Sequence, residues 1–146
     1  MPQSFRFSVT LALWPRDAVE LRAVRALVFI DEQKVPPGLE WDGRDDACVH
    51  VVARDGEGRV IGTGRLLPEG RIGRMAVLRE ARGKGVGAAI LRELLALARQ
   101  REIAVVELGA QTHAIGFYEK CGFVVISEEY LDAGIAHRTM RLDLND

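Results

Sequence analysis

A glycine-rich turn between a strand-like segment and a helix-like segment constrains the fold of this chain more than any other feature. Residues 71–77 have the composition of a strand, residues 82–87 read Arg-Gly-Lys-Gly-Val-Gly, and apolar residues recur at helical spacing over 85–101. Glycine lacks the Cβ atom that keeps a ligand away from the backbone, and the first turn of a helix has unpaired N–H groups. This order of elements predicts an anion-binding site at the start of the helix, here called the glycine turn.

The charges around the glycine turn indicate the kind of anion that would bind. Residues 71–84 hold five basic side chains and one acid, a formal charge of +4, whereas the whole chain carries -1. A phosphate-rich small molecule is therefore expected.

Two other phosphate-binding motifs fit the glycine turn less well. A P-loop would need Ser or Thr directly after Gly-Lys, and Gly85 follows Lys84 here. A dinucleotide-binding fingerprint would need an earlier glycine pair and an acid about 20 residues further on, and the spacing fits this poorly.

Length and composition limit the remaining possibilities. The 146 residues suit one domain, 1–146, and no apolar run reaches the roughly 18 residues of a membrane-spanning helix. The N-terminus lacks the pattern of a secretion signal, so we expect a cytoplasmic protein with no membrane partner. The near-zero net charge argues against a nucleic-acid partner. Cys48 and Cys121 have no neighbours at metal-ligand spacing, so no metal site is expected.

Apolar periodicity and turn residues predict an α+β chain. The expected helices cover 17–31, 85–101 and 114–121, and the expected strands cover 5–13, 47–53, 60–67, 71–77, 104–108, 123–128 and 137–142. A helix separates the strand at 71–77 from that at 104–108, which favours a parallel relation between the two. The segment 33–46 is expected to be a long loop. Six acids and two bases between 31 and 46 give a charge of -4, which would suit a cationic acceptor, and Arg65 is expected to pair with these acids.

Two motifs carry a resemblance to a known family. They are Met75-Ala76-Val77 followed by Arg82-x-x-Gly85-x-Gly87, and Gln111-x-x-Ala114-x-x-Phe117-Tyr118-x-Lys120-x-Gly122-Phe123. The first resembles the acetyl-CoA-binding motif of the GNAT N-acetyltransferases, and the second is similar to that family's Asn-x-x-Ala-x-x-Phe-Tyr element, with Gln111 in place of Asn. Flanking segments such as Leu39-Glu40-Trp41-Asp42 resemble the ElaA and YjcF branch. The resemblance covers nearly the whole chain.

The resemblance implies a fold and a binding mode for the donor. The GNAT fold is a mixed, mostly antiparallel central sheet with helices on both faces. It is splayed between its fourth and fifth strands by a bulge in the fourth. The acyl-pantetheine arm of acetyl-CoA lies in that gap, and the amides of the glycine turn hold the pyrophosphate. The residues that would bind the donor are Met75, Ala76, Val77, Arg82, Gly83, Lys84, Gly85, Val86, Gly87, Ala88, Gln111, Phe117 and Tyr118.

The chemistry implied is transfer of an acetyl group to a primary amine of a small molecule or peptide. A thioester is already activated, so a neutral amine needs orientation, loss of a proton and stabilisation of the leaving thiolate. Tyr118 is expected to donate to the thiolate, because a tyrosine of pKa near 10 stays protonated at neutral pH. Glu40 and His137 are the leading candidates for the base. Asp42, His50 and His113 are further titratable groups that we expect near the acceptor.

Two other functions remain open at this stage. Arg25-x-x-Val28-Phe29 followed by Glu40-x-Asp42 is similar to the N-terminal pattern of acyl-homoserine-lactone synthases, which share the fold but lack such a clear glycine turn. The second alternative is a CoA-binding sensor without catalytic activity. The chain could also form a homodimer.

Overall fold

The computed structural model describes residues 5–145, so both ends of the expected domain, 1–4 and 146, lie outside the described residues. Its strands are β1 (Phe7–Leu11), β2 (Val49–Asp55), β3 (Val60–Leu66), β4 (Ile72–Val77), β5 (Val105–Gln111), β6 (Val124–Val125), β7 (Tyr130–Asp132) and β8 (Ile135–Asp143). The α-helices are α1 (Ala18–Arg25), α2 (Pro37–Glu40), α3 (Val86–Gln100) and α4 (Ile115–Glu119). Shorter or irregular helices are η1 (Ala26–Glu32), η2 (Asp45–Ala47), η3 (Arg79–Ala81) and η4 (Thr112–Ala114).

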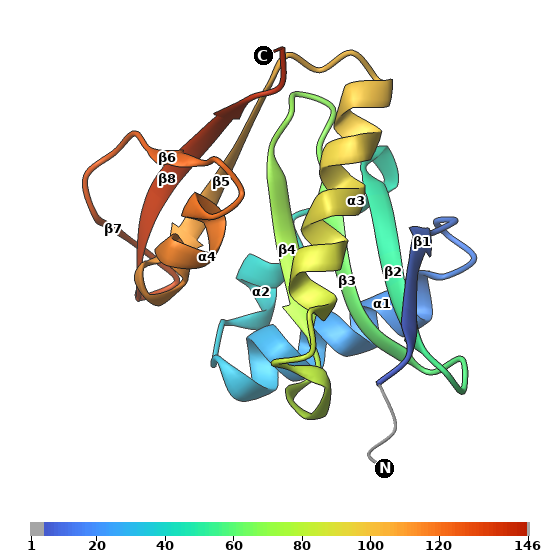
Figure 1. Ribbon diagram of the computed structural model, residues 1–146. Coiled ribbons are helices and arrows are strands. Elements are labelled where there is room, and N and C mark those ends of the chain that lie inside the picture. Colours follow the sequence, from blue (N-terminus) through green and yellow to red (C-terminus); the bar gives the residue numbers. More distant parts are fainter. Residues whose placement is uncertain (1–4, 146) are drawn as a thin grey trace.

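The strands form two antiparallel sheets that separate between β4 and β5. The first sheet has the order β1-β2-β3-β4, and the second has the order β5-β8-β6, with β7 also paired to β8. A single parallel bridge joins Arg71 to Glu107, and the N–H of Glu107 donates to Gly70 O at 3.1 Å. Beyond this point the two strands diverge (Figure 1). The expected splay between the fourth and fifth strands is therefore confirmed, and so is the parallel relation of these two strands.

A β-bulge in β4 accounts for the separation. Thr63 pairs with Ala76 and Arg65 pairs with Gly73, so one residue of β3 lies opposite both Arg74 and Met75 of β4. Arg74 has a φ angle of 49°, in the left-handed region. A bulge of this kind bends a strand and increases its twist. Because β4 bends here, its free edge turns away from β5.

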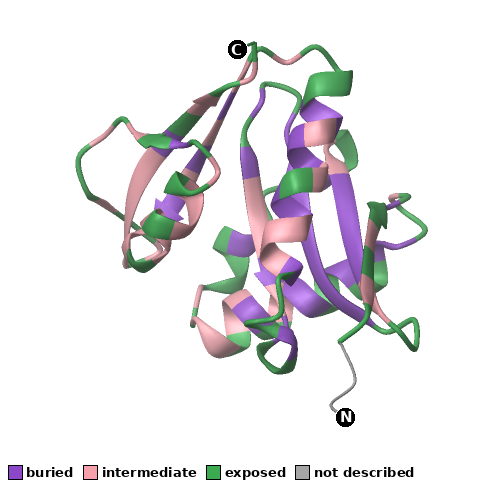
Figure 2. Ribbon diagram, in the orientation of Figure 1, coloured by how far each residue is buried: buried purple, intermediate pink, exposed green. Residues whose placement is uncertain are grey.

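Helices cover both faces of the first sheet. Figure 1 shows α3 in front of β3 and β4, while α1 passes behind the same sheet. Every residue of β3 is buried, in keeping with a strand covered on both sides (Figure 2). Gly64 allows α3 to approach closely, because a Cβ atom there would lie 2.8 Å from Ile90 Cγ2 and 2.9 Å from Leu94 Cδ1. This packing fixes the start of α3, and with it the glycine turn, against the end of β4.

Several boundaries differ from the sequence-based expectation. The first strand is shorter than 5–13, and the helix expected over 17–31 changes to a π-helix after Arg25. The side chain of Asp17 does not cap α1, because its Oδ2 accepts the N–H of Leu13 at 2.8 Å. The expected loop 33–46 contains α2 and the start of η2. Strand β7 was not expected, since it is only three residues long.

No helix within residues 5–145 is both long and apolar enough to cross a membrane.

Candidate active site

The backbone of the glycine turn presents a row of free amide groups. Gly83 and Gly85 have φ angles of +75° and +85°, and a Cβ atom at either position would meet nothing within 4 Å. The N–H groups of residues 83–88 donate no backbone hydrogen bond to any described residue. Arg82, by contrast, uses its N–H to donate to Arg79 O at 3.3 Å. The amides free for an anion therefore begin at residue 83, one residue later than the sequence motif.

The basic side chains at the glycine turn are partly occupied. The guanidinium of Arg82 donates to Glu32 Oε1 at 2.7 Å and to the carbonyl of Val77 at 2.9 Å. Lys84 Nζ lies 5.4 Å from the centre of the Phe5 ring. Because Glu32 already offsets the charge of Arg82, the backbone amides, rather than this guanidinium, are the main feature that favours an anion here.

A cavity of about 390 Å³ lies where the two sheets separate. Five of the expected site residues line it, namely Glu40, Met75, Gln111, Tyr118 and His137. The other residues expected to bind the donor are not part of its wall: Ala76, Val77, Phe117 and residues 82–88. Phe117 and Val77 nevertheless adjoin the glycine turn, since a Cβ atom on Gly87 would lie 3.9 Å from Phe117 Cζ and 4.0 Å from Val77 Cγ2. Phe117 also contacts Tyr118 on the cavity wall, with ring centroids 5.0 Å apart, so the glycine turn lies near the cavity.

Tyr118 lines the cavity and lies in an aromatic environment. Its ring makes edge contacts with Phe117 and Phe123, with centroids 5.0 Å and 5.9 Å away. Its hydroxyl lies 4.0 Å from Met75 Sδ on β4. Burial raises the pKa of the Tyr118 phenol above its usual value, because the charged form loses solvation. The hydroxyl therefore stays protonated at neutral pH and can donate a hydrogen bond.

His137 has a defined tautomer. Its Nδ1 lies 2.7 Å from the carbonyl of Ile135, and a carbonyl can only accept, so Nδ1 carries the proton. In the neutral ring Nε2 is then unprotonated and can accept a proton. The imidazole stacks on Tyr130, with ring centres 6.0 Å apart. His137 thus has the geometry of a proton acceptor on the cavity wall.

Gln111 reaches across the cavity from the end of β5. Its Nε2 donates to Gln33 Oε1 at 3.0 Å. This bond connects the second sheet to the segment that follows η1, on the other side of the site.

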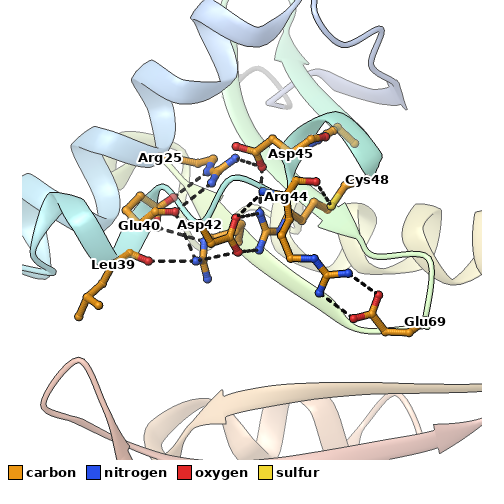
Figure 3. A network of polar contacts seen from close by, with 11 residues as sticks. Arg25, Leu39, Glu40, Asp42, Arg44, Asp45, Cys48 and Glu69 are labelled. Carbon is orange, nitrogen blue, oxygen red and sulfur yellow. Dashed lines mark hydrogen bonds and ion pairs between the residues drawn. The ribbon is translucent and has the colours of Figure 1, made fainter.

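Glu40 belongs to a network of three arginines and three acids, and four of these six residues are buried: Arg25, Glu40, Asp45 and Arg65 (Figure 3). Arg25 Nε donates to Glu40 Oε1 at 2.7 Å, and Arg74 Nε lies 3.2 Å from Glu40 Oε2. The other ion pairs join Arg25 to Asp45, Arg65 to Asp42 and Asp45, and Arg74 to Asp42. The expected pairing of Arg65 with loop acids is confirmed. The six charges of the network sum to zero.

This balance corrects the expectation of an acidic surface for a cationic acceptor. Glu40, Asp42 and Asp45 all have guanidinium partners, and Glu32 binds Arg82, so these acids are not free to attract a cation. The hydrogen bond from Arg65 holds the pKa of Asp42 well below its usual value, whereas burial raises the pKa of Glu40. The arginines that neutralise the segment lie far from it in sequence, so local counting of charges could not find them.

The remaining histidines expected near the acceptor are placed differently. His50 is buried outside the cavity, where its Nε2 lies 2.9 Å from Asp45 O and its ring stacks on Trp14, and burial lowers its pKa. His113 lines the cavity. Four further polar residues on the wall were missed: Gln33, Arg71, Arg74 and Asp132. Asp132 could not be assigned because it lies in the unexpected strand β7, while Arg71 had been counted only as part of the basic segment.

The fold and site define a class of protein, and comparison with known proteins supports the same class. The family model described as "Acetyltransferase (GNAT) domain" matches residues 29–144. The chain therefore belongs to the GNAT family of acetyltransferases. It is an N-acetyltransferase that catalyses acyl transfer, and the donors of this family are acyl-CoA thioesters.

Individual relatives agree with this assignment. The uncharacterized N-acetyltransferase YjcF of Bacillus subtilis is 40% identical over 124 residues, which cover 82% of this chain and 88% of that protein. The crystal structure of an acyl-CoA N-acyltransferase from Pseudomonas aeruginosa has a TM-score of 0.81 and 32% identity, over 94% of this chain and 99% of that one. Escherichia coli ElaA has a TM-score of 0.82 and 25% identity, over 95% and 99%. The resemblance to the ElaA and YjcF branch is confirmed.

Proposed function

We propose that the protein transfers an acetyl group from acetyl-CoA to a primary amine of a small molecule or peptide, by direct attack in a ternary complex. The observation that carries this proposal is the row of free amides at residues 83–88 beside a cavity that contains both Tyr118 and His137. The amides favour a diphosphate, and the two side chains supply the proton-handling groups that the reaction needs.

The free amides and the open edge of β4 fit the two ends of the donor. Consecutive N–H groups at a helix start bind phosphate oxygens well, because the helix dipole adds to their partial charges. The edge of β4 near Met75 is not paired with β5, which leaves room for an amide-containing chain to bind as a strand would. A backbone N–H in this region can donate to the thioester oxygen as it gains charge. The donor supplies the activated acyl group, and the chain supplies position and polarity.

His137 is the better of the two candidate bases. Its Nε2 is free to accept the proton that the amine loses as the new C–N bond forms and the C–S bond breaks. Glu40 lies on the same wall, but its oxygens already bind Arg25 and Arg74. Protonation of Glu40 would weaken both ion pairs. Tyr118 donates a hydrogen bond to the departing thiolate, so the step ends with a proton on His137 and CoA as its thiolate.

Direct attack is favoured over an acyl-enzyme route. Among the described residues that line the cavity there is no cysteine, serine or threonine. These are the side chains that most often form acyl-enzymes. Initial rates measured over a grid of donor and acceptor concentrations should therefore give intersecting reciprocal plots. Parallel plots, together with an acetylated protein detected by mass spectrometry, would overturn direct attack.

The substitution Gly87→Glu tests the donor site. Gly87 lies in the first turn of α3, and a Cβ atom there meets only ordinary contacts, so the fold should persist. The new carboxylate would face the site of the pyrophosphate, and we expect at least a tenfold rise in the Kd for acetyl-CoA, about 1.4 kcal/mol. Gln100→Glu adds the same charge at the other end of α3 and should leave the Kd unchanged. Equal affinities in calorimetry for Gly87→Glu and the wild type would overturn the donor site.

An amine panel separates the alternative functions. Release of CoA thiol with simple amines supports acetyl transfer. Release only with long-chain acyl donors supports the acyltransferase resembling acyl-homoserine-lactone synthases, and tight binding of acetyl-CoA without turnover supports a sensor. The homodimer and the cytoplasmic location also remain predictions. Sedimentation and fractionation of cells would test them.

A further inference from the structure

One arginine on the cavity wall has no side-chain partner among residues 5–145. Arg71 precedes β4 and lines the cavity, and no described residue forms a hydrogen bond or an ion pair with its guanidinium. Arg74, the other arginine on this wall, contacts Glu40 and Asp42. The nearby carboxylate of Glu69 binds Arg44, at 2.7 Å and 2.8 Å. Among the described residues of the wall, Arg71 is therefore the cation that is free to bind a ligand.

Gly109 brings the guanidinium of Arg71 next to the proposed base. A Cβ atom on Gly109 would lie 3.2 Å from Arg71 Nη2, 2.9 Å from Tyr130 Oη and 3.9 Å from His137 Cδ2. All three side chains thus converge over one point of β5, which must lack a side chain of its own. Because 3.2 Å and 3.9 Å are measured from the same point, Arg71 Nη2 and His137 Cδ2 are no more than about 7 Å apart. Nε2 of His137 is bonded to that carbon.

The charges around this point favour a ligand that carries both a negative and a positive group. The network of Arg25, Arg65, Arg74, Glu40, Asp42 and Asp45 is neutral, so Glu40 and Arg74 add no net charge to the wall. What remains is Arg71, together with Asp132 of β7. A carboxylate would match Arg71, and an ammonium group that approaches the cavity would match Asp132.

We propose that Arg71 binds a carboxylate of the acceptor, so that the acceptor is an amino acid or another small amine with a carboxylate a few ångströms from its nitrogen. This inference rests on the proposed function and names the substrate class of the same site. A guanidinium binds a carboxylate through two parallel hydrogen bonds, which orients the ligand as well as holding it. With the carboxylate on Arg71, the amine of an amino acid lies within reach of His137 Nε2.

Pairs of acceptors that differ only at the carboxylate test the proposal. The probes are L-alanine, L-glutamine and L-phenylalanine, each compared with its carboxamide, and the measurement is kcat/KM from release of CoA thiol. We expect the wild type to prefer at least one amino acid over its carboxamide by about 10- to 100-fold. Arg71→Gln should bring this ratio close to one, through a higher KM for the amino acid. The Kd for acetyl-CoA should not change, and kcat/KM for the carboxamide should fall much less than that for the amino acid.

A control and a binding measurement keep the result interpretable. Arg92→Gln removes the same charge from an exposed position on α3 outside the cavity wall and should keep the preference. Calorimetry with N-acetyl-L-phenylalanine and its carboxamide on the CoA-saturated protein gives a second readout that needs no turnover. Only the acid should bind, and only when Arg71 is present.

The outcomes distinguish a failure of the proposed role of Arg71 from a failure of the proposed acetyl transfer. Turnover that prefers carboxamides or simple alkylamines would overturn the role of Arg71 and leave acetyl transfer intact. A higher Kd for acetyl-CoA in Arg71→Gln than in the wild type would assign Arg71 to binding of the donor. This result would also overturn its proposed role in binding the acceptor. Absence of turnover with every amine would overturn the proposed function. In that case, equal binding of the acid and the carboxamide would overturn this inference as well.

Discussion

Tyr118 lines the cavity, and its ring packs against Phe117 and Phe123. We propose that its hydroxyl also serves the reaction. Tyr118→Phe keeps the ring and removes only the hydroxyl. We expect kcat to fall by about 10²- to 10⁴-fold, the usual range for loss of a proton donor, while the Kd for acetyl-CoA changes by less than about threefold. Steady-state kinetics and calorimetry provide the two values. An equal loss in both would mean that Tyr118 serves packing alone.

His137 and Glu40 can be separated by replacing each with glutamine. His137→Gln should lower kcat by at least about 100-fold, because it removes the group that takes the amine proton. Glu40→Gln is expected to lower kcat far less, because it removes an ion-pair partner of Arg25 and not the base. Steady-state kinetics at one pH would measure both values. If instead His137→Gln keeps most of kcat and Glu40→Gln loses it, the assignment is reversed.

The residues of the site differ in how far the sequence alone reveals them. The glycine turn and Tyr118 lie in short motifs whose spacing carries the signal, so they could be found without a structure. The position of Arg71 beside His137 depends on the pairing of β5 with β8, in which Gly109 lies opposite Thr139 and Gln111 opposite His137. Such a register joins residues far apart in sequence, and no local pattern encodes it.

At the scale of elements, the ion network fixes the short helix α2 and the loop after it to the first sheet. Arg25 comes from α1, Arg65 from β3 and Arg74 from the bulge of β4, and all three bind acids between residues 40 and 45. This segment looked like a loop in the sequence because Pro36, Pro37 and Gly38 interrupt any periodicity. The segment is held in place by ion pairs with arginines that lie elsewhere in the sequence. Composition could predict a loop here, but not an anchored wall of the active site.

Asp42→Asn tests this anchoring through its pH dependence. The pKa of Asp42 is lower in the folded protein than its ordinary value of 3.8, because the side chain accepts hydrogen bonds from Arg65. Its stabilising effect is therefore present above pH 3.8 and is lost as the pH falls below that value. We expect Asp42→Asn to lower the free energy of unfolding by about 2 kcal/mol at neutral pH.

Urea unfolding at about pH 7, 5 and 3 would measure this difference. The wild type and the variant should differ by the same amount at the two higher values and by less at the lowest. Arg44 binds Glu69 on the exposed surface, so Glu69→Gln is a suitable control and should change stability much less than Asp42→Asn does. A difference between wild type and Asp42→Asn that does not shrink in acid would contradict the role of the Asp42 carboxylate.

At the scale of the whole molecule, the two sheets share one core even though their strands separate. Buried residues from both sheets, such as Ile72, Val106 and Met140, belong to one continuous apolar cluster together with the core face of α3. The general fold was predictable because two motifs and the strand order fix it. The width of the gap was not, since it arises from the bulge at Arg74 and from a single bridge at Arg71.

A shared core and a gap between the sheets lead to a prediction about thermal unfolding. The core is continuous, so the protein should unfold in one transition by calorimetry, without separate melting of the second sheet.

The gap between the sheets leads to a second prediction, about the effect of the donor on thermal unfolding. A donor that binds across the gap stabilises only the folded state. At 100 times its Kd, acetyl-CoA should add about 2.7 kcal/mol and raise the Tm by roughly 5–10 °C. Gly87→Glu should melt near the wild-type temperature and lose at least about half of this increase at the same acetyl-CoA concentration, in line with its tenfold or greater rise in Kd. Two resolved transitions would show that the sheets are independent units, and an undiminished increase in Gly87→Glu would place the donor away from the glycine turn.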